Sequence, residues 1–599
     1  MCGITGFIST KPLPKNVIER MTDSIVARGP DGYGYHYGDH FAFGHRRLSI
    51  VDLSEAGHQP MHYLDRYIIT FNGEIYNHIE LRNELIEQGY SFNSHTDTEV
   101  IMAAYDHWGV MCLSRFNGMW AFALYDIQTK QFFISRDRFG KKPLYYYKDK
   151  NNFVFASEIK AILLHPDVTT EPNIDFLNNF LKYGCKEYLV ETAFRDIYRF
   201  EASSYFLGTE EALIDNFTAQ KFWEIHPNLS HEKFDDKKAI DYAQHYYQLL
   251  EDAVRIRLRA DVKVGSALSG GLDSSSIVYL VNKLLKEQGK EDLQETFSSV
   301  YKSIGTKHCD ESNYINLMAA QLGVHSNQIE PIESDIPTEH ERMIYALENP
   351  PENSLMSSWY TFKLVASTDV KVTLDGQGAD EQLSGYLPYL MNYISSLNAI
   401  DMFQETYRCL SIPQAQKYVL IGFGMGIFRI VFGQKFLLFI LTKVLKKNFE
   451  PNLNQKLAND TRQSLVTLIH YADHTSMAYS IESRMPFMDY RLVEFLASVP
   501  ACYKMHHGWT KYLARLAFDG KLPDEVNWRR DKMGWPIPEQ KWFEGNLKSW
   551  FNGALTKSSL FSRLTITREN NAERIFAQKV RCMNASRWYY RFFESKENV

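Results

Sequence analysis

Cysteine is scarce and scattered in this chain of 599 residues. Its seven cysteines are odd in number, widely spaced and free of any CxxC pair. That pattern argues against a disulfide framework or a zinc site and favours the reducing cytoplasm. The first ten residues, MCGITGFIST, have no basic segment followed by an apolar core, so we expect no secretory signal.

An excess of charge of one sign is also missing. Lys and Arg total 66 and Asp and Glu total 72, which gives a net charge of -6. The charges are scattered, so we do not expect nucleic acid as a partner. Hydrophobic residues make up 45% of the chain and charged residues 23%, which is typical of a soluble globular protein, and the length predicts two or three domains.

Long uncharged apolar runs are absent, with one near exception at residues 418–445. Arg429 and Lys435 interrupt this stretch. Because a spanning helix needs about 20 nearly uncharged residues, we expect no stable membrane insertion. We predict a helical hairpin that is buried or covered by a partner, with contact to a membrane surface as the alternative.

Two rhythms of secondary structure divide the chain. Up to about residue 160, short apolar runs between turn signals predict strands, and three- and four-residue apolar spacing predicts helices at 17–27 and 98–108. This pattern indicates mostly antiparallel sheets layered between helices. After a connection at about 170–235, long helical stretches alternate with short strands, which predicts a parallel sheet with ligands at the carboxyl ends of its strands. The elements expected there are a helix at 239–259 and strands at 262–268, 295–301 and 370–376.

Cys2 follows the initiator methionine, and its small side chain favours removal of Met1. Removal leaves a thiol and a free α-amine on one residue. An α-amine with a pKa of about 7.7 to 8 can accept the thiol proton, so the pattern predicts a nucleophile that carries its own base. Taken alone, a cysteine at this position can also be an accident of sequence.

Further motifs follow Cys2 in the same part of the chain. They are RGPD at 28–31, RLSIV at 47–51, NGEIYN at 72–77 and the single residue Asp97. In this order they resemble the glutaminase domain of the class II glutamine amidotransferases, which are N-terminal-nucleophile hydrolases.

The resemblance implies a role for each residue of these motifs. Arg47 would bind the α-carboxylate of glutamine, and Glu74 and Asp97 its α-ammonium group. The Asn72 amide and the Gly73 N–H would stabilise the oxyanion, and losing one such donor typically costs about 10²- to 10³-fold in rate. The full implied glutamine-binding set is Arg47, Leu48, Ser49, Ile50, Val51, Asn72, Gly73, Glu74 and Asp97. Without the resemblance, each feature has an ordinary interpretation: the Asn-Gly pair would be a turn signal, Arg47 would be a surface residue, and Asp97 would cap a helix.

A second candidate site lies in residues 264–276, VGSALSGGLDSSS, which predict a strand, a Ser/Gly loop and a helix from about Ser274. Gly270 and Gly271 permit a nest of backbone N–H groups, and the helix start adds partial positive charge, which favours phosphate. Neither GxxxxGKS/T nor GxGxxG occurs, which disfavours a kinase or a dehydrogenase. The loop resembles the pyrophosphate loop of the N-type ATP pyrophosphatases; a structural strand-to-helix turn is the alternative.

A second acidic loop, DGQGADE at 375–381, follows the strand at 370–374 and should open on the same edge of the sheet. The resemblance implies that Asp273 and Asp380 hold Mg²⁺ against the leaving pyrophosphate. Read without the family, the segment is a Gly-rich turn with solvated acids.

Three later features complete the pattern: ESRMPFMD at 482–489, Lys511, and RRDKMG at 529–534. This order resembles the glutamine-hydrolysing asparagine synthetases over nearly the whole chain. The resemblance implies an αββα sandwich at 1–200, then an α/β parallel-sheet domain of the ATP pyrophosphatase type, with extra helices, at 201–599.

The implied ATP-binding residues are Leu268, Ser269, Gly270, Gly271, Asp273, Ser274, Ser299, Asp375 and Gly376. Lys511 would face the phosphates, although alone it reads as a solvated helix residue, and Arg529, Arg530 and Lys532 stay unassigned.

The activity implied is amidation of L-aspartate to L-asparagine with L-glutamine and ATP as co-substrates. Cys2, Asn72, Gly73 and Lys511 would be catalytic. One departure opens an alternative, because Gln377 stands where the best-known members carry a glutamate thought to handle ammonia and the activated intermediate. An amide cannot take a proton, so either Glu381 or Asp375 substitutes or the acceptor is another carboxylate, such as a uronic acid in polysaccharide biosynthesis. A catalytically silent regulatory module is a third hypothesis, and the oligomeric state, a homodimer included, stays open.

Overall fold

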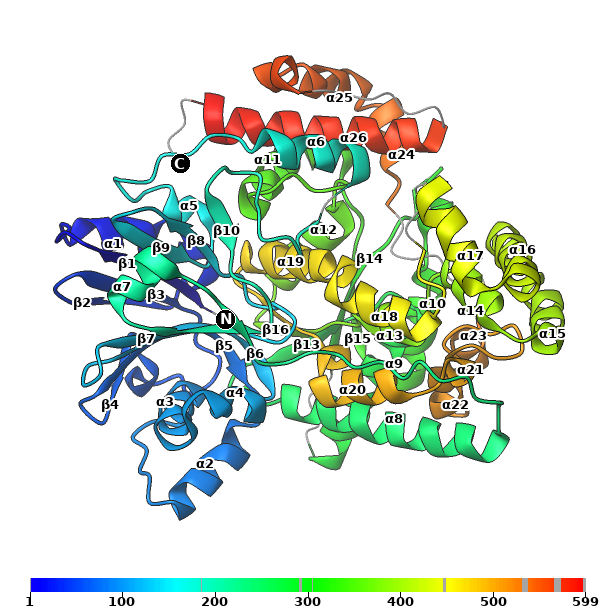
Figure 1. Cartoon of the computed structure of the whole chain (residues 1–599), viewed down its shortest axis with the longest axis horizontal. Coiled ribbons are helices and arrows are strands. Elements are labelled where there is room, and N and C mark those ends of the chain that lie inside the picture. Colours follow the sequence, from blue (N-terminus) through cyan, green and yellow to red (C-terminus); the bar gives the residue numbers. More distant parts are fainter. Residues whose placement is uncertain are drawn as a thin grey trace.

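The computed structural model describes residues 2–184, 186–289, 294–303, 305–444, 449–530, 537–564 and 572–595. Antiparallel sheets fill the blue-to-cyan half of the molecule, and a parallel sheet surrounded by helices fills the other half (Figure 1). Lys532, one of the unassigned basic residues, lies outside the described residues.

The N-terminal half contains two six-stranded antiparallel sheets. The first has the order β10 (Ile197–Arg199), β8 (Tyr145–Lys148), β9 (Asn152–Ala156), β1 (Gly3–Ser9), β3 (Phe41–Arg47) and β2 (Gly32–Tyr37). The second has the order β12 (Gln220–Lys221), β11 (Ser204–Gly208), β7 (Gln131–Arg136), β6 (Gly118–Asp126), β5 (Tyr67–Ile75) and β4 (Met61–Tyr63). The domain boundary near residue 200 stays a prediction, although β11 and β12 follow it in the chain and complete the second sheet.

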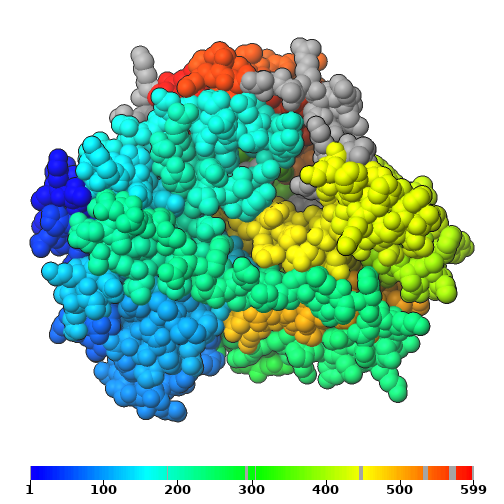
Figure 2. All heavy atoms as spheres, in the orientation of Figure 1, coloured from blue at the N-terminus to red at the C-terminus, as the bar shows by residue number. Residues whose placement is uncertain are grey.

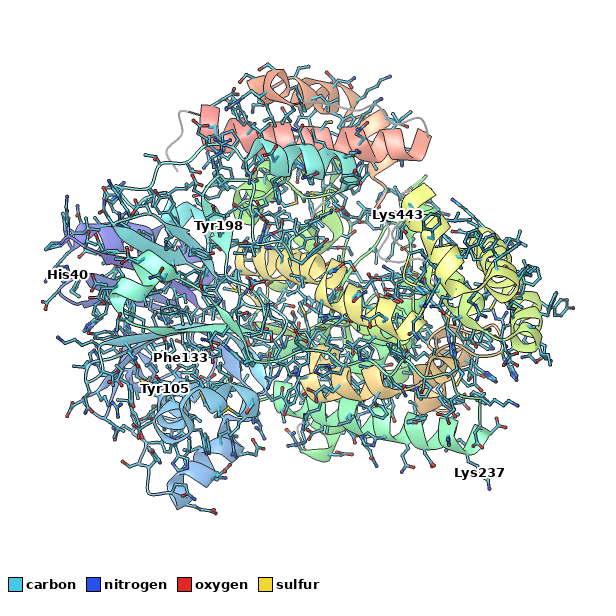
Figure 3. The ribbon with its side chains drawn as sticks, viewed as in Figure 1. His40, Tyr105, Phe133, Tyr198, Lys237 and Lys443 are labelled. Atoms are coloured by element: carbon cyan, nitrogen blue, oxygen red, sulfur yellow. The ribbon has the colours of Figure 1, made fainter. Side chains whose placement is uncertain are left out.

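Alternating side chains of these strands build the layers. Ile4, Ile8 and Phe43 of the first sheet pack against Ile68 and Ile134 of the second. The outer face of the first sheet is covered by α1 (Asn16–Asp23), and that of the second by α2 (His78–Glu87) and α3 (Asp97–Trp108). Tyr105 of α3 stacks on Phe133 of β7 with ring centroids 4.6 Å apart (Figure 3). The predicted αββα sandwich is confirmed.

The C-terminal half contains a five-stranded parallel sheet, which confirms the second part of the predicted fold. Its order is β15 (His325–Ile329), β14 (Glu295–Ser299), β13 (Val264–Ala267), β16 (Val372–Leu374) and β17 (Glu482–Arg484). The predicted strands are β13, β14 and β16, and the predicted helix is α8 (Asp236–Arg257). β15 and β17 were not predicted, because they are short and polar.

Helices surround this sheet. The helices nearest the candidate site are α9 (Leu272–Glu287), α10 (Ser312–Leu322), α12 (Met356–Val365), α13 (Ala379–Leu383), α18 (Leu453–Arg462), α19 (Ser464–Met477), α20 (Tyr490–Ser498) and α22 (Tyr512–Phe518). The last long helix, α26 (Ala572–Tyr589), packs against α6 (Ile174–Tyr183) (Figure 1). The segment 170–235, expected to be a simple connection, therefore also supplies α6 and strands β10 to β12.

The described part of the apolar stretch, residues 418–444, forms α16 (Gln416–Phe432), α17 (Gln434–Phe439) and the π-helix Ile440–Val444; Gly433 separates α16 from α17, and residue 445 lies outside the described residues. The prediction that this stretch is helical is confirmed. The stretch is only partly buried, because one face of α16 is exposed to solvent. Among the described residues, no helix combines the length and the apolar character that crossing a bilayer requires.

Candidate active sites

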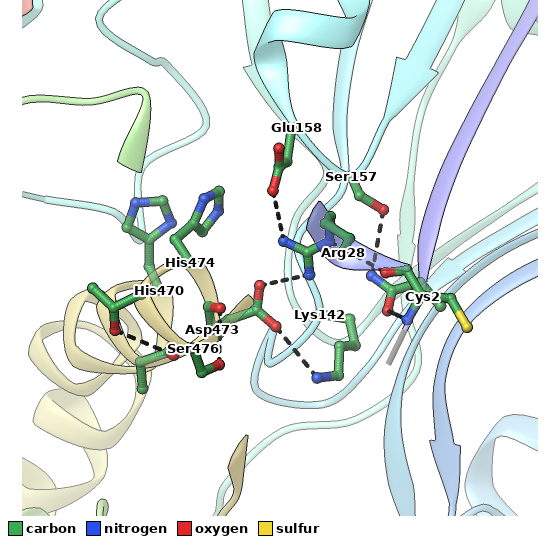
Figure 4. A network of polar contacts seen from close by, with 12 residues as sticks. Cys2, Arg28, Lys142, Ser157, Glu158, His470, Asp473, His474 and Ser476 are labelled. Carbon is green, nitrogen blue, oxygen red and sulfur yellow. Dashed lines mark hydrogen bonds and ion pairs between the residues drawn. The ribbon is translucent and has the colours of Figure 1, made fainter. Parts of the chain in front are cut away.

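Cys2 precedes β1, the strand that lies between β9 and β3 in the first sheet. Its backbone nitrogen donates to Asn72 Oδ1 at 3.2 Å, and its Sγ lies 4.0 Å from the Leu48 carbonyl oxygen. Arg28 Nε donates to the Cys2 carbonyl oxygen at 3.2 Å (Figure 4). Three segments that are distant in the sequence thus fix the position of this residue.

A small cavity opens beside Cys2 and gathers most of the predicted glutamine-binding residues. Arg47, Leu48, Ile50, Val51, Gly73, Glu74 and Asp97 line it together with Cys2. Ser49 does not line this cavity; its backbone N–H donates to Asp31 Oδ2 at 2.9 Å.

The Asn-Gly pair lies within strand β5 rather than in a turn. A Cβ on Gly73 would come within 2.1 Å of the Met119 carbonyl oxygen on the neighbouring strand, so only glycine fits there. Asn72 Nδ2 donates to Ser157 Oγ at 3.3 Å, which holds the amide in place beside Cys2.

The charged residues of the cavity have opposite signs. Arg47 Nη1 donates to the Ser54 carbonyl oxygen at 2.8 Å, and its Nη2 donates to that of Asp52. Glu74 is buried, and within the described part of the chain its Oε1 has no hydrogen-bond partner. Its Oε2 lies 3.5 Å from an Arg484 nitrogen of the C-terminal half. An acidic oxygen left unpaired beside a cavity is suited to a ligand cation.

Burial is the main cause of the shifted pKa values of the residues that line this cavity. It raises the pKa of Asp97 to about 6 and that of Glu74 well above its ordinary value, and the neighbouring Asp97 charge raises the pKa of Glu74 further. Burial also raises the pKa of the Cys2 thiol. A bound ammonium group between the carboxylates would offset their repulsion.

Asp97 does not cap its helix. Thr96 is the N-cap of α3, with Oγ1 accepting from Glu99 N, while Asp97 Oδ2 accepts from Ile75 N at 2.7 Å. Sequence reasoning missed Thr96, Thr98 and Gln59 as cavity residues. The TxxE capping box was a signal for Thr96, but Gln59 had none, since its role depends on a contact with Phe71 on another strand.

The second predicted site forms at the carboxyl ends of β13 and β16. Gly270 has a φ of +73°, and Gly271 is the N-cap of α9 with no side-chain cap, so the N–H groups of the first turn of α9 lie next to this loop. The two loops are in contact: a Cβ on Gly376 would lie 3.2 Å from Ser274 N. Because the strands are parallel neighbours, both loops open on one edge.

Lys511 joins the two predicted metal ligands. Its Nζ lies 2.6 Å from Asp273 Oδ2 and also pairs with Asp380 Oδ1. Lys511 is only 3% exposed and precedes α22 with a φ of +53°, so it is not the solvated helix residue of the alternative reading.

Among the described residues, no group of three or more His, Cys, Asp or Glu could hold a metal. Two carboxylates that converge on one cation still fit Mg²⁺, which takes one or two protein carboxylates plus phosphate and water oxygens.

A cavity of about 340 Å³ extends from these loops toward α12 and α19. It is lined by Ser269, Asp273, Ser274, Asp375, Gly376, Gln377 and Asp380 among the predicted residues. Leu268 is buried behind it, and the Ser299 hydroxyl donates to the Ser357 carbonyl oxygen at 2.8 Å. Lining residues that the sequence did not reveal include Asn353, Thr361 and Tyr471, which come from distant helices and loops.

Gln377 lines this cavity, and two acids lie near it in the chain. Burial raises the pKa of Glu381 to about 7, with the Asp380 charge adding to the shift, and Tyr386 OH donates to Glu381 Oε1 at 2.8 Å. Burial raises the pKa of Asp375 to about 6. The unassigned arginines have other partners, since Arg529 pairs with Glu311 at 2.8 Å and Arg530 lies over the Trp509 ring.

The two sites are physically connected. In β17, Ser483 Oγ donates to Asp375 Oδ2 of the second cavity, while the next residue, Arg484, reaches Glu74 of the first. A second contact is an ion-pair network in which Arg28 pairs with Glu158 at 3.0 Å and with Asp473 of α19 at 2.8 Å (Figure 4). Lys142 adds a contact of 3.3 Å to Asp473, whose pKa these cations hold well below its usual range.

Comparison with known proteins gives two family matches. Residues 1–223 match a glutamine amidotransferase domain, and residues 245–586 match the asparagine synthase family. The chain is 30% identical to asparagine synthetase (glutamine-hydrolyzing) 3 of Bacillus subtilis, over 92% of this chain and 89% of that protein. It is 29% identical to asparagine synthetase 1 of the same organism (93% and 90% covered) and 27% identical to the amidase chry2 of Gibberella zeae (94% and 92% covered).

Proposed function

The chain belongs to the asparagine synthase family and carries a glutamine amidotransferase domain, and from this we propose that it converts L-aspartate to L-asparagine with glutamine and ATP. The products are asparagine, glutamate, AMP and pyrophosphate. We place the enzyme in the cytoplasm, where its thiols stay reduced.

In the first half-reaction, removal of Met1 leaves the Cys2 α-amine to accept the thiol proton. Sulfur attacks the side-chain carbonyl carbon of glutamine, and the oxyanion is stabilised by the Asn72 amide and the Gly73 N–H. The C–N bond breaks, ammonia leaves with the proton from the α-ammonium group, and water hydrolyses the thioester to glutamate. Arg47 orients the α-carboxylate, while Glu74 and Asp97 bind the α-ammonium group.

In the second half-reaction, a carboxylate oxygen of the acceptor attacks the α-phosphorus of ATP, and pyrophosphate leaves. The Gly270–Gly271 loop and the start of α9 offer N–H groups to the phosphates, and Lys511 neutralises charge as it develops. Asp273 and Asp380 would hold Mg²⁺, which neutralises the charge of the pyrophosphate. Ammonia then attacks the acyl-adenylate carbon and AMP leaves.

One observation carries the proposal. Arg47, the adjacent pair Gly73 and Glu74, and Asp97 come from three separate segments and meet in one cavity with Cys2, where a buried Glu74 oxygen has no partner among the described residues. An α-amino acid with an ammonium group and a carboxylate satisfies both charges of that cavity.

A second candidate keeps both half-reactions and replaces aspartate with another carboxylate, such as a uronic acid. Gln377 favours it, because this neutral amide lines the acceptor cavity and can hydrogen-bond sugar hydroxyls as both donor and acceptor.

The decisive experiment measures AMP and pyrophosphate formation by the purified enzyme with glutamine, ATP, Mg²⁺ and one carboxylate at a time. We expect aspartate to release both products stoichiometrically with asparagine. If only a uronic acid or another acid does so, the asparagine assignment fails. If no acid supports ATP–pyrophosphate exchange, the silent-module hypothesis replaces both.

A further inference from the structure

An apolar patch covers the end of the molecule that lies farthest from the N-terminal sheets. It is formed by α15 (Ala399–Cys409), α16 and α17, drawn in yellow-green and yellow (Figures 1 and 2). Its large side chains range from 40% to 81% exposed, whereas scattered single apolar residues are the norm on soluble proteins. The patch consists of Ile400, Phe403, Tyr407, Leu420, Ile421, Ile427, Ile430, Val431, Phe432, Phe436 and Phe439.

The fold of α16 explains why these side chains face outward. Its inner face carries Val419, Gly422 and Gly426, which are buried against the protein. A Cβ on Gly422 would lie 2.9 Å from Met391 Cα of α14 (Tyr389–Ser396), so the two helices are in close contact. Since α16 is apolar on both faces, the face opposite α14 must either meet water or be covered.

The patch is continuous across two helices. Phe403 of α15 contacts Phe423 of α16, with ring centroids 5.0 Å apart. The one charge in the middle of α16 does not interrupt the outer face, because Arg429 turns inward and its Nε donates to the Ser395 carbonyl oxygen at 2.8 Å.

The charged residues of α16 and α17 are all basic, whereas α15 also carries Asp401 and Glu405, of which Glu405 is buried and pairs with Arg408. Between residues 406 and 449 the sequence contains no Asp or Glu. Lys417, Lys435 and Lys443 are exposed on the described helices, and Lys443 lies in the π-helix Ile440–Val444 that follows α17 (Figure 3). The basic residues of the segment are Arg408, Lys417, Arg429, Lys435, Lys443, Lys446 and Lys447, the last two outside the described residues.

We propose that this patch docks on an anionic phospholipid bilayer surface, with the Phe, Ile and Val side chains entering the boundary between headgroups and acyl chains and the lysines bound to lipid phosphates. Exposed apolar residues combined with lysines are the two components of interfacial membrane binding. A second copy of the chain fits less well, because a symmetric interface would bring α16 and α17, whose charged residues are all basic, against their own copies. The inference is independent of which carboxylate the enzyme amidates.

The test is flotation of the purified full-length enzyme with vesicles of phosphatidylcholine, with and without about one-third phosphatidylglycerol. We expect flotation with the anionic vesicles, weakening as salt is raised, and at least about tenfold weaker partition into neutral vesicles. Val431→Glu should lower the partition by about tenfold or more, because it places a charge in the apolar boundary. Lys435→Gln should lower it about fivefold.

Matched controls lie on α8. Ile240 is 62% exposed and Val431 63%, so Ile240→Glu makes the same change at the same exposure. Lys237→Gln is the control for charge (Figure 3). Glutamine hydrolysis, measured in each variant, reports folding.

Absence of flotation by the unaltered enzyme would overturn the proposal, and so would equal losses in the α8 controls. A dimer seen by sedimentation velocity that Val431→Glu dissociates, without vesicle binding, would assign the patch to a second copy instead.

Discussion

Cys2 is distinguished from the other described cysteines by its surroundings. It lines a cavity together with Gly73 and the carboxylates of Glu74 and Asp97, whereas the buried Cys112, Cys309 and Cys409 line neither this cavity nor the second one. The structure thus brings one thiol together with the residues that we propose as oxyanion donor and amino-acid ligands.

Cys2→Ala should lower glutamine-dependent amidation by about 10³-fold or more, because the sulfur nucleophile is lost. Ammonia-dependent amidation should stay within about twofold, since the second cavity does not use the thiol. Parallel assays of AMP formation with glutamine and with ammonium chloride measure this. Cys502→Ala, on a half-buried thiol, is the control. Equal losses with both nitrogen donors would contradict the division of labour.

The pH dependence of glutamine binding should follow Asp97 and Glu74. Binding of an α-ammonium group needs ionised carboxylates, and the raised pKa of Asp97, about 6, means that this carboxyl becomes neutral as the pH falls through that range, while burial raises the pKa of Glu74 as well. A group with a pKa of about 6 is roughly one-tenth ionised at pH 5, so KM for glutamine should rise about tenfold between pH 7 and pH 5. Steady-state glutamine hydrolysis checks this. Asp97→Asn should raise KM and flatten its pH dependence, and a KM of the native enzyme that is constant over this range would refute the assignment.

At the scale of elements, β17 contacts one lining residue of each cavity. Successive side chains of a strand point to opposite faces, so Ser483 faces Asp375 while Arg484 faces Glu74. This three-residue strand therefore connects the cavity beside Cys2 to the second cavity, which extends from the loops after β13 and β16.

Ser483→Ala should weaken ATP binding and leave glutamine hydrolysis unchanged. Without the hydroxyl, the buried Asp375 carboxylate loses a donor, and a hydrogen bond to a charged group is worth about 1.5 to 3 kcal/mol, or tenfold or more in kcat/KM for ATP. Ser480→Ala is the control. Ser480 lies just before β17 in the chain, and its hydroxyl donates to the Ala27 carbonyl oxygen. Similar losses of kcat/KM in both variants would argue for a general disturbance of the strand.

The elements that sequence could predict are those with a strong local pattern. The strand, loop and helix around Gly270 and Gly271 depend on adjacent residues, and so do the short apolar runs between turn signals that identified the N-terminal strands. β17 escaped prediction because Glu482 and Arg484 read as solvent-facing, yet both are buried in mutual ion pairs. Gln59 and Tyr471 escaped because only the assembled fold brings them to the cavities.

At the scale of the whole molecule, buried charges hold the two halves together. Asp473 of α19 meets Arg28 and Lys142 from the N-terminal half, and all three side chains are almost completely buried (Figure 4). Ammonia made at Cys2 must reach the second cavity without escaping to solvent, so the fit between the halves bears directly on coupling.

Asp473→Asn should uncouple the two reactions more than it impairs either one. The change leaves the Lys142 ammonium and part of the Arg28 charge without their anion, and breaking a buried ion pair costs about 3 to 5 kcal/mol of stability or interface free energy. We expect glutamate release to exceed amide formation in this variant, and we expect the unaltered enzyme to release the two in equal amounts. Glu339→Gln is the matched control, because it removes a buried carboxylate that pairs with Lys363 within the C-terminal half. If both variants lose stability alike and keep equal amounts of glutamate and amide product, the network serves folding alone, and the coupling of the halves must depend on β17.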